Sequence, residues 1–163
     1  MSVIDELLTN NAAFAANPET RDLPSAPAKR LAIVACMDAR LDPYEVLGLT
    51  IGDAHVIRNA GGVITDDEIR SLAISQHLLG TEEIMLIHHT DCGMLKVSND
   101  EFHQLLEDHS GERPGWHTMS FSDIEWSVRD SIERIKASPF IPRTDAVRGF
   151  IFDVHTGRLA EVN

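Results

Sequence analysis

The chain lacks the features that mark secreted and membrane proteins. It has only two cysteines, Cys36 and Cys92, among its 163 residues, too few for the disulfide framework of a small secreted domain. It has no charged start followed by an apolar signal core, and no apolar run near the roughly 20 residues that span a bilayer. We therefore expect a cytoplasmic protein whose cysteines are thiols or metal ligands and not a disulfide.

Positive charge is also scarce. Lysine and arginine together number 14 against 26 acidic residues, so the net charge is −12. Such a surface repels polyanions, which argues against nucleic acid or membrane partners and favours a small-molecule substrate. A chain of this length needs only one core, which buries roughly two-thirds of the unfolded surface. We predict a single domain over residues 1–163.

Short apolar runs predict the strands, and capping patterns predict the helices. Buried strands are expected at 31–36, 54–57 and 83–88. Ser/Thr/Asp caps predict helices at 42–48, 65–80, 98–106 and from Ser122 to Pro139. Residues 147–154 and 159–162 predict a hairpin. This order indicates an α/β fold with a mainly parallel central β-sheet, helices on both faces and a C-terminal antiparallel edge hairpin.

The first residues are set apart from this pattern. Ser2 is a helix cap, and Ile4, Leu7 and Leu8 form one apolar stripe, so residues 1–16 are interpreted as an N-terminal helical arm. Residues 17–29 carry three prolines and are expected to be a linker, which leaves residues 30–163 as the core. A helix detached in this way often packs on a partner subunit.

Residues able to bind a metal follow two of the predicted strands. Cys36, Asp38 and Arg40 alternate where the first strand ends, and His89 and Cys92 follow the end of another. Parallel strands place their carboxyl ends at one edge of a sheet, where open α/β sheets bind their ligands. Two thiolates and one imidazole suit zinc, and three protein ligands leave a fourth position free for water. We expect an open zinc site.

These residues form an ordered signature. The pattern Cys36-x-Asp38-x-Arg40 followed by His89-x-x-Cys92-Gly93, with Arg58-Asn59-Ala60-Gly61 between them and residues 149–157 after them, resembles that of the β-class carbonic anhydrases. The resemblance is closest to the short bacterial members and covers most of the chain.

The resemblance implies a role for each matched residue. It implies one Zn²⁺ per chain held by Cys36, His89 and Cys92, with Asp38 and Arg40 as the catalytic pair that orients the zinc-bound water. In some family members the matching aspartate leaves its arginine and becomes a fourth zinc ligand in a closed state, which makes Asp38 a possible ligand. The family's N-terminal helix reaches across a dimer, so a homodimer or homotetramer is expected.

The leading functional hypothesis is a zinc lyase. It reversibly hydrates carbon dioxide to bicarbonate and a proton by means of a zinc-bound hydroxide. One alternative is hydrolysis of carbonyl sulfide or carbon disulfide on the same zinc scaffold, with substrate choice set by the apolar residues of the pocket wall and entry tunnel, such as Met37, Met94, Leu95 and Phe102. Another is a non-catalytic zinc-stabilised binding protein with Asp38 as permanent fourth ligand. A metal-free thiol redox protein is disfavoured because no Cys-x-x-Cys occurs.

Neighbouring residues have simpler interpretations. His88 points away from His89 if the strand stays extended, which predicts a packing role. Arg58 and Asn59 are expected to line the cleft, while Gly61 and Gly62 allow a close approach of the backbone. Asp91 is typical of an Asx turn.

Overall fold

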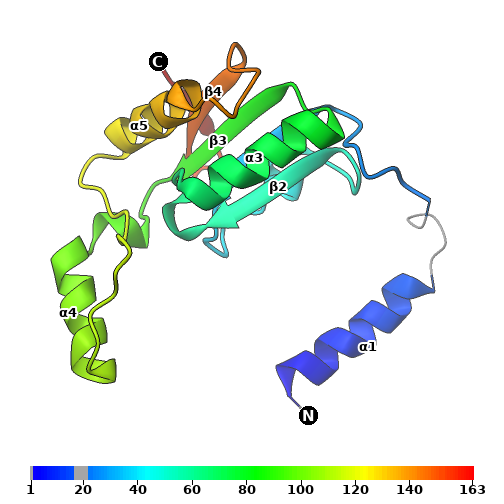
Figure 1. Cartoon of the computed structure of the whole chain (residues 1–163). Helices are drawn as coiled ribbons and strands as arrows, with labels where there is room; N and C mark the ends of the chain where they lie inside the picture. Colours follow the sequence, from blue (N-terminus) through cyan, green and yellow to red (C-terminus); the bar gives the residue numbers. More distant parts are fainter. Residues whose placement is uncertain (1, 17–21) are drawn as a thin grey trace.

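The computed structural model describes residues 2–16 and 22–163. A helix begins the chain, and strands then alternate with helices before a final pair of strands (Figure 1). The elements in chain order are α1 (Val3–Ala15), β1 (Leu31–Cys36), α2 (Pro43–Leu47), β2 (Ala54–Asn59), η2 (Ala60–Gly62), α3 (Asp66–Leu79), β3 (Glu83–His89), η3 (Gly93–Leu95), α4 (Asn99–Ser110), α5 (Ile124–Ala137), β4 (Val147–Phe152) and β5 (Leu159–Val162).

The strands form one five-stranded sheet in the order β2-β1-β3-β4-β5. The first three pairings are parallel, and β4 pairs antiparallel with β5 at the edge. The predicted α/β fold with its antiparallel edge hairpin is confirmed. Since β1 lies between β2 and β3, the carboxyl end of the strand that carries Cys36 is flanked by the ends of both neighbours.

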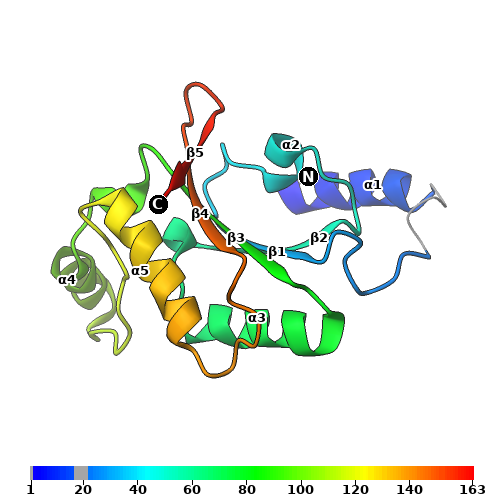
Figure 2. The ribbon, with the colours of Figure 1, turned by 90° about the horizontal axis from the view of Figure 1, so that it is seen from above.

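The two faces of the sheet are covered unequally. Helices α3 and α5 lie on one face, and the short α2 lies on the other (Figure 2). One buried cluster, which includes Val34, Leu72, Leu86 and Ile135, packs α3 and α5 onto the sheet. A second cluster, which includes Ile33 and Leu41, fills the opposite face and reaches Cys36 and Cys92. The two cysteines of the predicted metal site are therefore part of a packed core.

Most predicted helix starts are confirmed in detail. Capping boxes begin α1 at Ser2, α3 at Thr65 and α4 at Ser98. The prediction for α5 was wrong by one residue, because the side chain of Asp123, and not that of Ser122, accepts a hydrogen bond from the backbone N–H of Trp126. An ionised carboxylate at this position also interacts favourably with the helix dipole.

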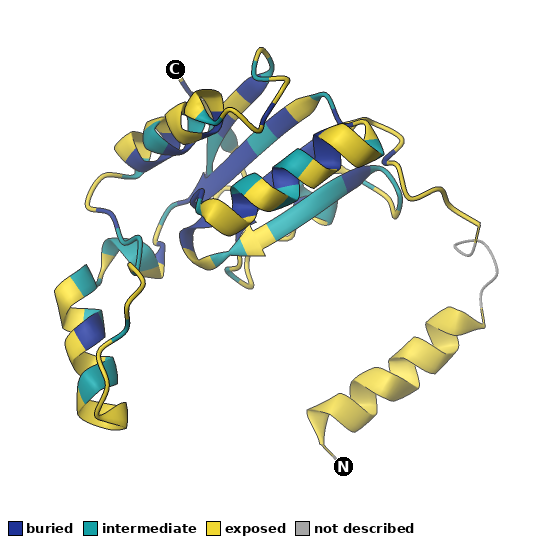
Figure 3. Ribbon diagram, viewed as in Figure 1, coloured by how far each residue is buried: buried dark blue, intermediate teal, exposed yellow. Residues whose placement is uncertain are grey.

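Helix α1 buries none of its residues, and Figure 3 draws all of it as exposed. Figure 1 places it apart from the sheet. Of the predicted linker, residues 17–21 lie outside the described residues, and residues 22–29 contain neither helix nor strand. No helix within residues 2–16 and 22–163 has the length and apolar character needed to cross a bilayer.

Candidate metal centre

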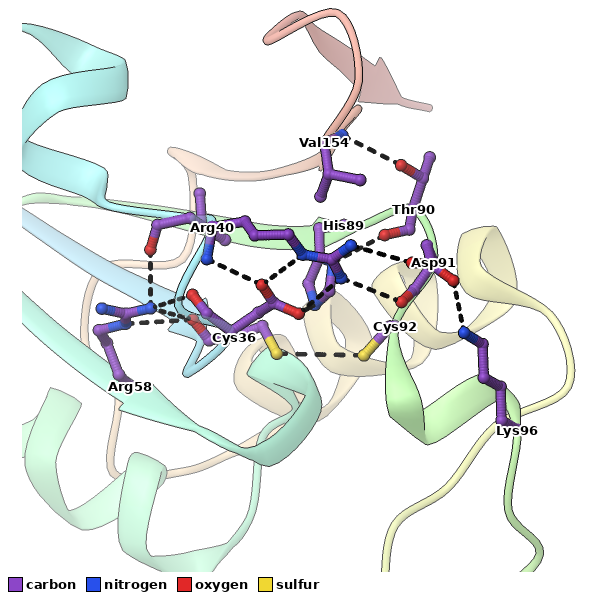
Figure 4. Close-up of polar contacts among 11 residues, drawn as sticks. Cys36, Arg40, Arg58, His89, Thr90, Asp91, Cys92, Lys96 and Val154 are labelled. Carbon is purple, nitrogen blue, oxygen red and sulfur yellow. Dashed lines mark hydrogen bonds and ion pairs between the residues drawn. The ribbon is translucent and has the colours of Figure 1, made fainter.

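The predicted metal ligands lie together at the carboxyl edge of the sheet (Figure 4). Parallel pairing of β1 with β3 brings Cys36, at the end of β1, close to His89 and the loop that carries Cys92. The ligand atoms of Cys36, His89 and Cys92 all lie within 4.8 Å of one another, and all three residues are buried. The two sulfur atoms are 4.0 Å apart. Residues 56 positions apart in the sequence thus form one cluster.

The geometry of this cluster fits zinc. Two thiolates bound to a tetrahedral zinc at about 2.3 Å each are separated by about 3.8 Å, close to the separation found here. His89 Nδ1 lies 2.8 Å from the carbonyl oxygen of Thr90, so it carries the proton of the neutral ring. His89 Nε2 is buried and has no hydrogen-bond partner among the described residues. Its lone pair is therefore available to a cation.

The electrostatics of the cluster also favour a cation. The Cys92 thiol donates a hydrogen bond that lowers the pKa of Cys36 against the opposing effect of burial, while the same pairing raises the pKa of Cys92. Burial acts to lower the pKa of His89, but the nearby Cys36 sulfur, the Thr90 carbonyl and the Asp38 carboxylate raise it overall. These shifts report a negative field at the point where the three ligands meet.

Asp38 lies beside the three ligands and is held by Arg40. The Arg40 Nε and Nη2 atoms donate to the two carboxylate oxygens at 2.9 and 2.8 Å, and the backbone N–H of Arg40 donates to Oδ1 at 2.9 Å. These hydrogen bonds, chiefly that of the Arg40 side chain, hold the pKa of Asp38 well below its usual range. Asp38 Oδ2 is 3.7 Å from His89 Nε2. An ionised carboxylate therefore faces the metal position while it is paired with Arg40.

Arg58 supports the loop that carries this pair. Its guanidinium donates to the carbonyl oxygens of Cys36, Asp38 and Leu41 at 2.7 to 3.1 Å. These hydrogen bonds give the Nε and Nη2 atoms of Arg58 a structural role, and its expected place in the lining of the cleft stays a prediction. Asn59 likewise donates to the carbonyl oxygen of Val63 at 2.7 Å.

The expected close approach at the glycine pair is confirmed at Gly62. A Cβ atom at this position would lie 2.9 Å from both the Cys36 nitrogen and the Ile87 oxygen. The residue also has a positive φ of 69°, which favours glycine. Segment η2 therefore packs directly on the backbone of β1 and β3 beneath the metal ligands.

The structure agrees with the role predicted for His88 but not with the one predicted for Asp91. His88 is fully buried and its Nε2 lies 3.1 Å from Ser127 Oγ, as expected for a packing role. The expected Asx turn at Asp91 is not what its carboxylate forms, since Asp91 makes ion pairs with Arg40 and Lys96. Nothing in the sequence spacing signalled these contacts, because Arg40 lies 51 residues from Asp91.

The residues named for the pocket wall lie near this centre but differ in burial. Met37 is 64% exposed, while Met94 and Leu95 are partly buried against the core cluster that contains Cys36 and Cys92. Met94 Cγ also lies 3.1 Å from the position of a Cβ atom on Gly61. The apolar wall near the metal position is thus formed in part by η3.

Comparisons with known proteins agree with this geometry. A family model described as carbonic anhydrase matches residues 31–159. The chain is 54% identical over 162 residues to β-carbonic anhydrase 1 of Mycobacterium tuberculosis, with 99% of each chain covered. It is 36% identical over 152 residues to a carbon disulfide hydrolase of Acidithiobacillus thiooxidans, covering 80% of this chain and 76% of that one.

A solved structure gives the same result at the level of the fold. The carbonic anhydrase of Streptococcus mutans matches with a TM-score of 0.94 and 47% identity, covering 100% of this chain and 99% of that one. Cys36, His89 and Cys92 form the triad typical of the zinc site in β-carbonic anhydrases. The chain therefore belongs to the β-class carbonic anhydrase family.

Proposed function

We propose that this protein is a zinc lyase that reversibly hydrates carbon dioxide to bicarbonate and a proton. One Zn²⁺ per chain is held by Cys36, His89 and Cys92. The observation that carries the proposal is the meeting of these three donors beside a carboxylate that is already paired with an arginine. Three protein ligands leave one tetrahedral position for a water, as in catalytic zinc sites.

The roles of the chain's own residues follow from their contacts. A zinc ion held by these three donors would supply Lewis acidity, which would lower the pKa of a water beside it. Asp38 Oδ2 is 3.7 Å from His89 Nε2, so the carboxylate would accept a hydrogen bond from a water on the metal and would orient that water toward the substrate carbon. Arg40 neutralises and holds Asp38, which keeps the carboxylate ionised and away from the metal. Asp38 is the catalytic residue, and Arg40 positions it.

The pairing of Asp38 with Arg40 also bears on two alternatives. A permanent fourth ligand requires Asp38 to leave Arg40, so the observed pairing favours an open site over a non-catalytic zinc protein. Hydrolysis of carbon disulfide or carbonyl sulfide is the second candidate, because a carbon disulfide hydrolase is among the relatives. Carbon dioxide is preferred because the β-carbonic anhydrase relative shares more identity over more of the chain.

The first experiment measures both reactions on the purified zinc protein. Carbon dioxide hydration is followed by stopped-flow, and release of hydrogen sulfide from carbon disulfide and carbonyl sulfide is followed in parallel. We expect rapid hydration and little sulfide release. Rapid sulfide release without hydration would instead assign the hydrolase function, and stoichiometric zinc with neither activity would assign a structural metal.

The second experiment separates metal binding from water orientation. We expect Cys92→Ser to lose zinc, because a thiolate ligand is removed, while Asp38→Ala keeps zinc and loses most of its hydration rate, roughly 10²-fold or more. Zinc content by elemental analysis and kcat/KM are measured for each variant. Asp67→Asn, which breaks an exposed ion pair on α3, is the control. Full hydration by Asp38→Ala would remove the water-orienting role.

The proposal also covers the domain organisation, the location and the oligomeric state of the protein. We propose a cytoplasmic single domain in which residues 1–16 are an arm, 17–29 a linker and 30–163 the catalytic core. The apolar stripe of α1 is exposed at Ile4, Leu7 and Leu8, and this supports its packing on a second copy in a homodimer or homotetramer. The substrate is a small molecule, with no nucleic acid or membrane partner.

A further inference from the structure

The Arg40 guanidinium joins the two loops that carry the metal ligands. It pairs with Asp38 on its own loop after β1, and its Nη1 donates to Asp91 Oδ2 at 2.9 Å on the loop after β3. Its Nη2 also lies 3.3 Å from the Asp91 carbonyl oxygen. Four of the five N–H groups of an arginine side chain are therefore used, two of them on Asp91.

Asp91 is itself held in place. Its other carboxylate oxygen, Oδ1, accepts from Lys96 Nζ. The backbone of Asp91 has a φ of 55°, a left-handed conformation in which aspartate, asparagine and glycine are the tolerated residues. This conformation occurs one residue before the ligand Cys92. The carboxylate thus faces Arg40 from a fixed point beside the metal ligands (Figure 4).

These contacts contribute little to stability. The side chains of Arg40 and Asp91 are 45% and 42% exposed, and ion pairs at such exposure are weakened by solvent screening. Their geometric effect is larger. A half-exposed arginine anchored only by Asp38 is free to swing together with that carboxylate, whereas a second anchor from another loop fixes the plane of the guanidinium.

We infer that Asp91 is a positioning residue for the hydration reaction: it fixes Arg40, and through Arg40 it sets the orientation of the Asp38 carboxylate at the metal. Lys96 acts one step further away by holding Asp91. This inference rests on the proposed role of Asp38. The Asp91–Arg40 contact itself is present in the structure and does not depend on which substrate is used.

The test compares two substitutions that both tolerate the left-handed backbone. Asp91→Gly removes the side chain, and Asp91→Asn keeps an oxygen that accepts from Arg40 Nη1. We expect Asp91→Gly to lower kcat/KM for carbon dioxide about tenfold with zinc content unchanged, as is typical for residues that orient catalytic groups. Asp91→Asn should restore most of the rate. Lys96→Met should cause a smaller loss, and none when added to Asp91→Gly.

A readout other than activity decides whether the contact is responsible. The Arg40 Nε–H proton is followed by ¹⁵N NMR and assigned with Arg40→Lys. We expect slow solvent exchange in the wild type and in Asp91→Asn, and fast exchange in Asp91→Gly. Unchanged exchange in Asp91→Gly, or an equal rate loss in both Asp91 variants, would overturn the inference. A wild type without hydration activity but with a protected Arg40 proton would refute the proposed function and leave the contact established.

Discussion

His88 is a titratable residue placed where it cannot easily be charged. Its side chain is fully buried, with Nε2 3.1 Å from Ser127 Oγ and its ring against Phe121. Burial lowers the pKa of His88 to about 4, with the Cys36 charge opposing the shift. The neutral ring is therefore the form that packs between β3 and α5, directly next to the ligand His89.

This burial predicts a dependence of stability on pH. An unfolded histidine takes up a proton below about pH 6.5, whereas folded His88 does so only near pH 4. Between these values the unfolded state binds more protons, so the free energy of unfolding falls as pH falls, by up to about 3 kcal/mol for this residue. We expect His88→Gln, which does not titrate, to lose less stability on acidification than the wild type.

Urea unfolding at about pH 7 and about pH 5 measures the difference. His155→Gln, at an exposed histidine, is the matched control and should follow the wild type. Equal losses for the wild type and His88→Gln would show that His88 is not the residue responsible.

Segment η2 is positioned by a backbone contact that only glycine allows. Gly62 has a positive φ and lies against the backbone of Cys36 and Ile87, as described above. Gly80 at the end of α3 has a similar φ of 73°, but a Cβ atom there would meet no other atom within 4 Å. The two glycines share one backbone conformation and differ in the space around them.

Gly62 and Gly80 allow a matched experiment on the position of η2. Alanine at either site costs about 1–2 kcal/mol for the left-handed backbone. Gly62→Ala adds overpacking against a rigid backbone, which we expect to cost a further ~1–3 kcal/mol and to weaken zinc binding by moving Cys36. Chemical denaturation and a zinc-chelator competition measure the two effects. Similar stability and zinc affinity in both variants would show that η2 shifts to accommodate the Cβ atom without a loss of folding free energy.

Local sequence signals were enough to predict most elements and the metal ligands. Caps such as Thr65 and Ser98 act within one helical turn, and Cys36 and His89 each end an apolar run, so neighbours in the sequence carry the information. The contacts of Arg58 with three carbonyls and of Asp91 with Arg40 could not be predicted, because they join residues about 20 and 51 positions apart in the sequence. Such contacts depend on how the strands are ordered in the sheet.

At the scale of the whole molecule, α1 is a helix whose apolar side chains are not covered by the rest of the described chain. Its apolar stripe is exposed and the helix buries none of its residues. We expect Leu7→Glu to shift the protein toward a smaller oligomer, because it places a charge in the stripe that a second copy is proposed to cover. Sedimentation velocity measures the change.

Ala13→Glu adds the same charge on the opposite side of α1 and is the control for this experiment. It should leave the oligomer unaltered. A wild type that sediments as a monomer, or equal effects of the two substitutions, would contradict packing through the apolar stripe.

The exposed stripe of α1 also has a thermodynamic consequence. Under the proposed packing on a second copy, the leucines and isoleucine of this stripe become buried on association, so that part of the hydrophobic free energy follows mass action. The midpoint of thermal unfolding should then rise with protein concentration. Dilution alone should lower the thermal stability of the protein, with no change in its sequence.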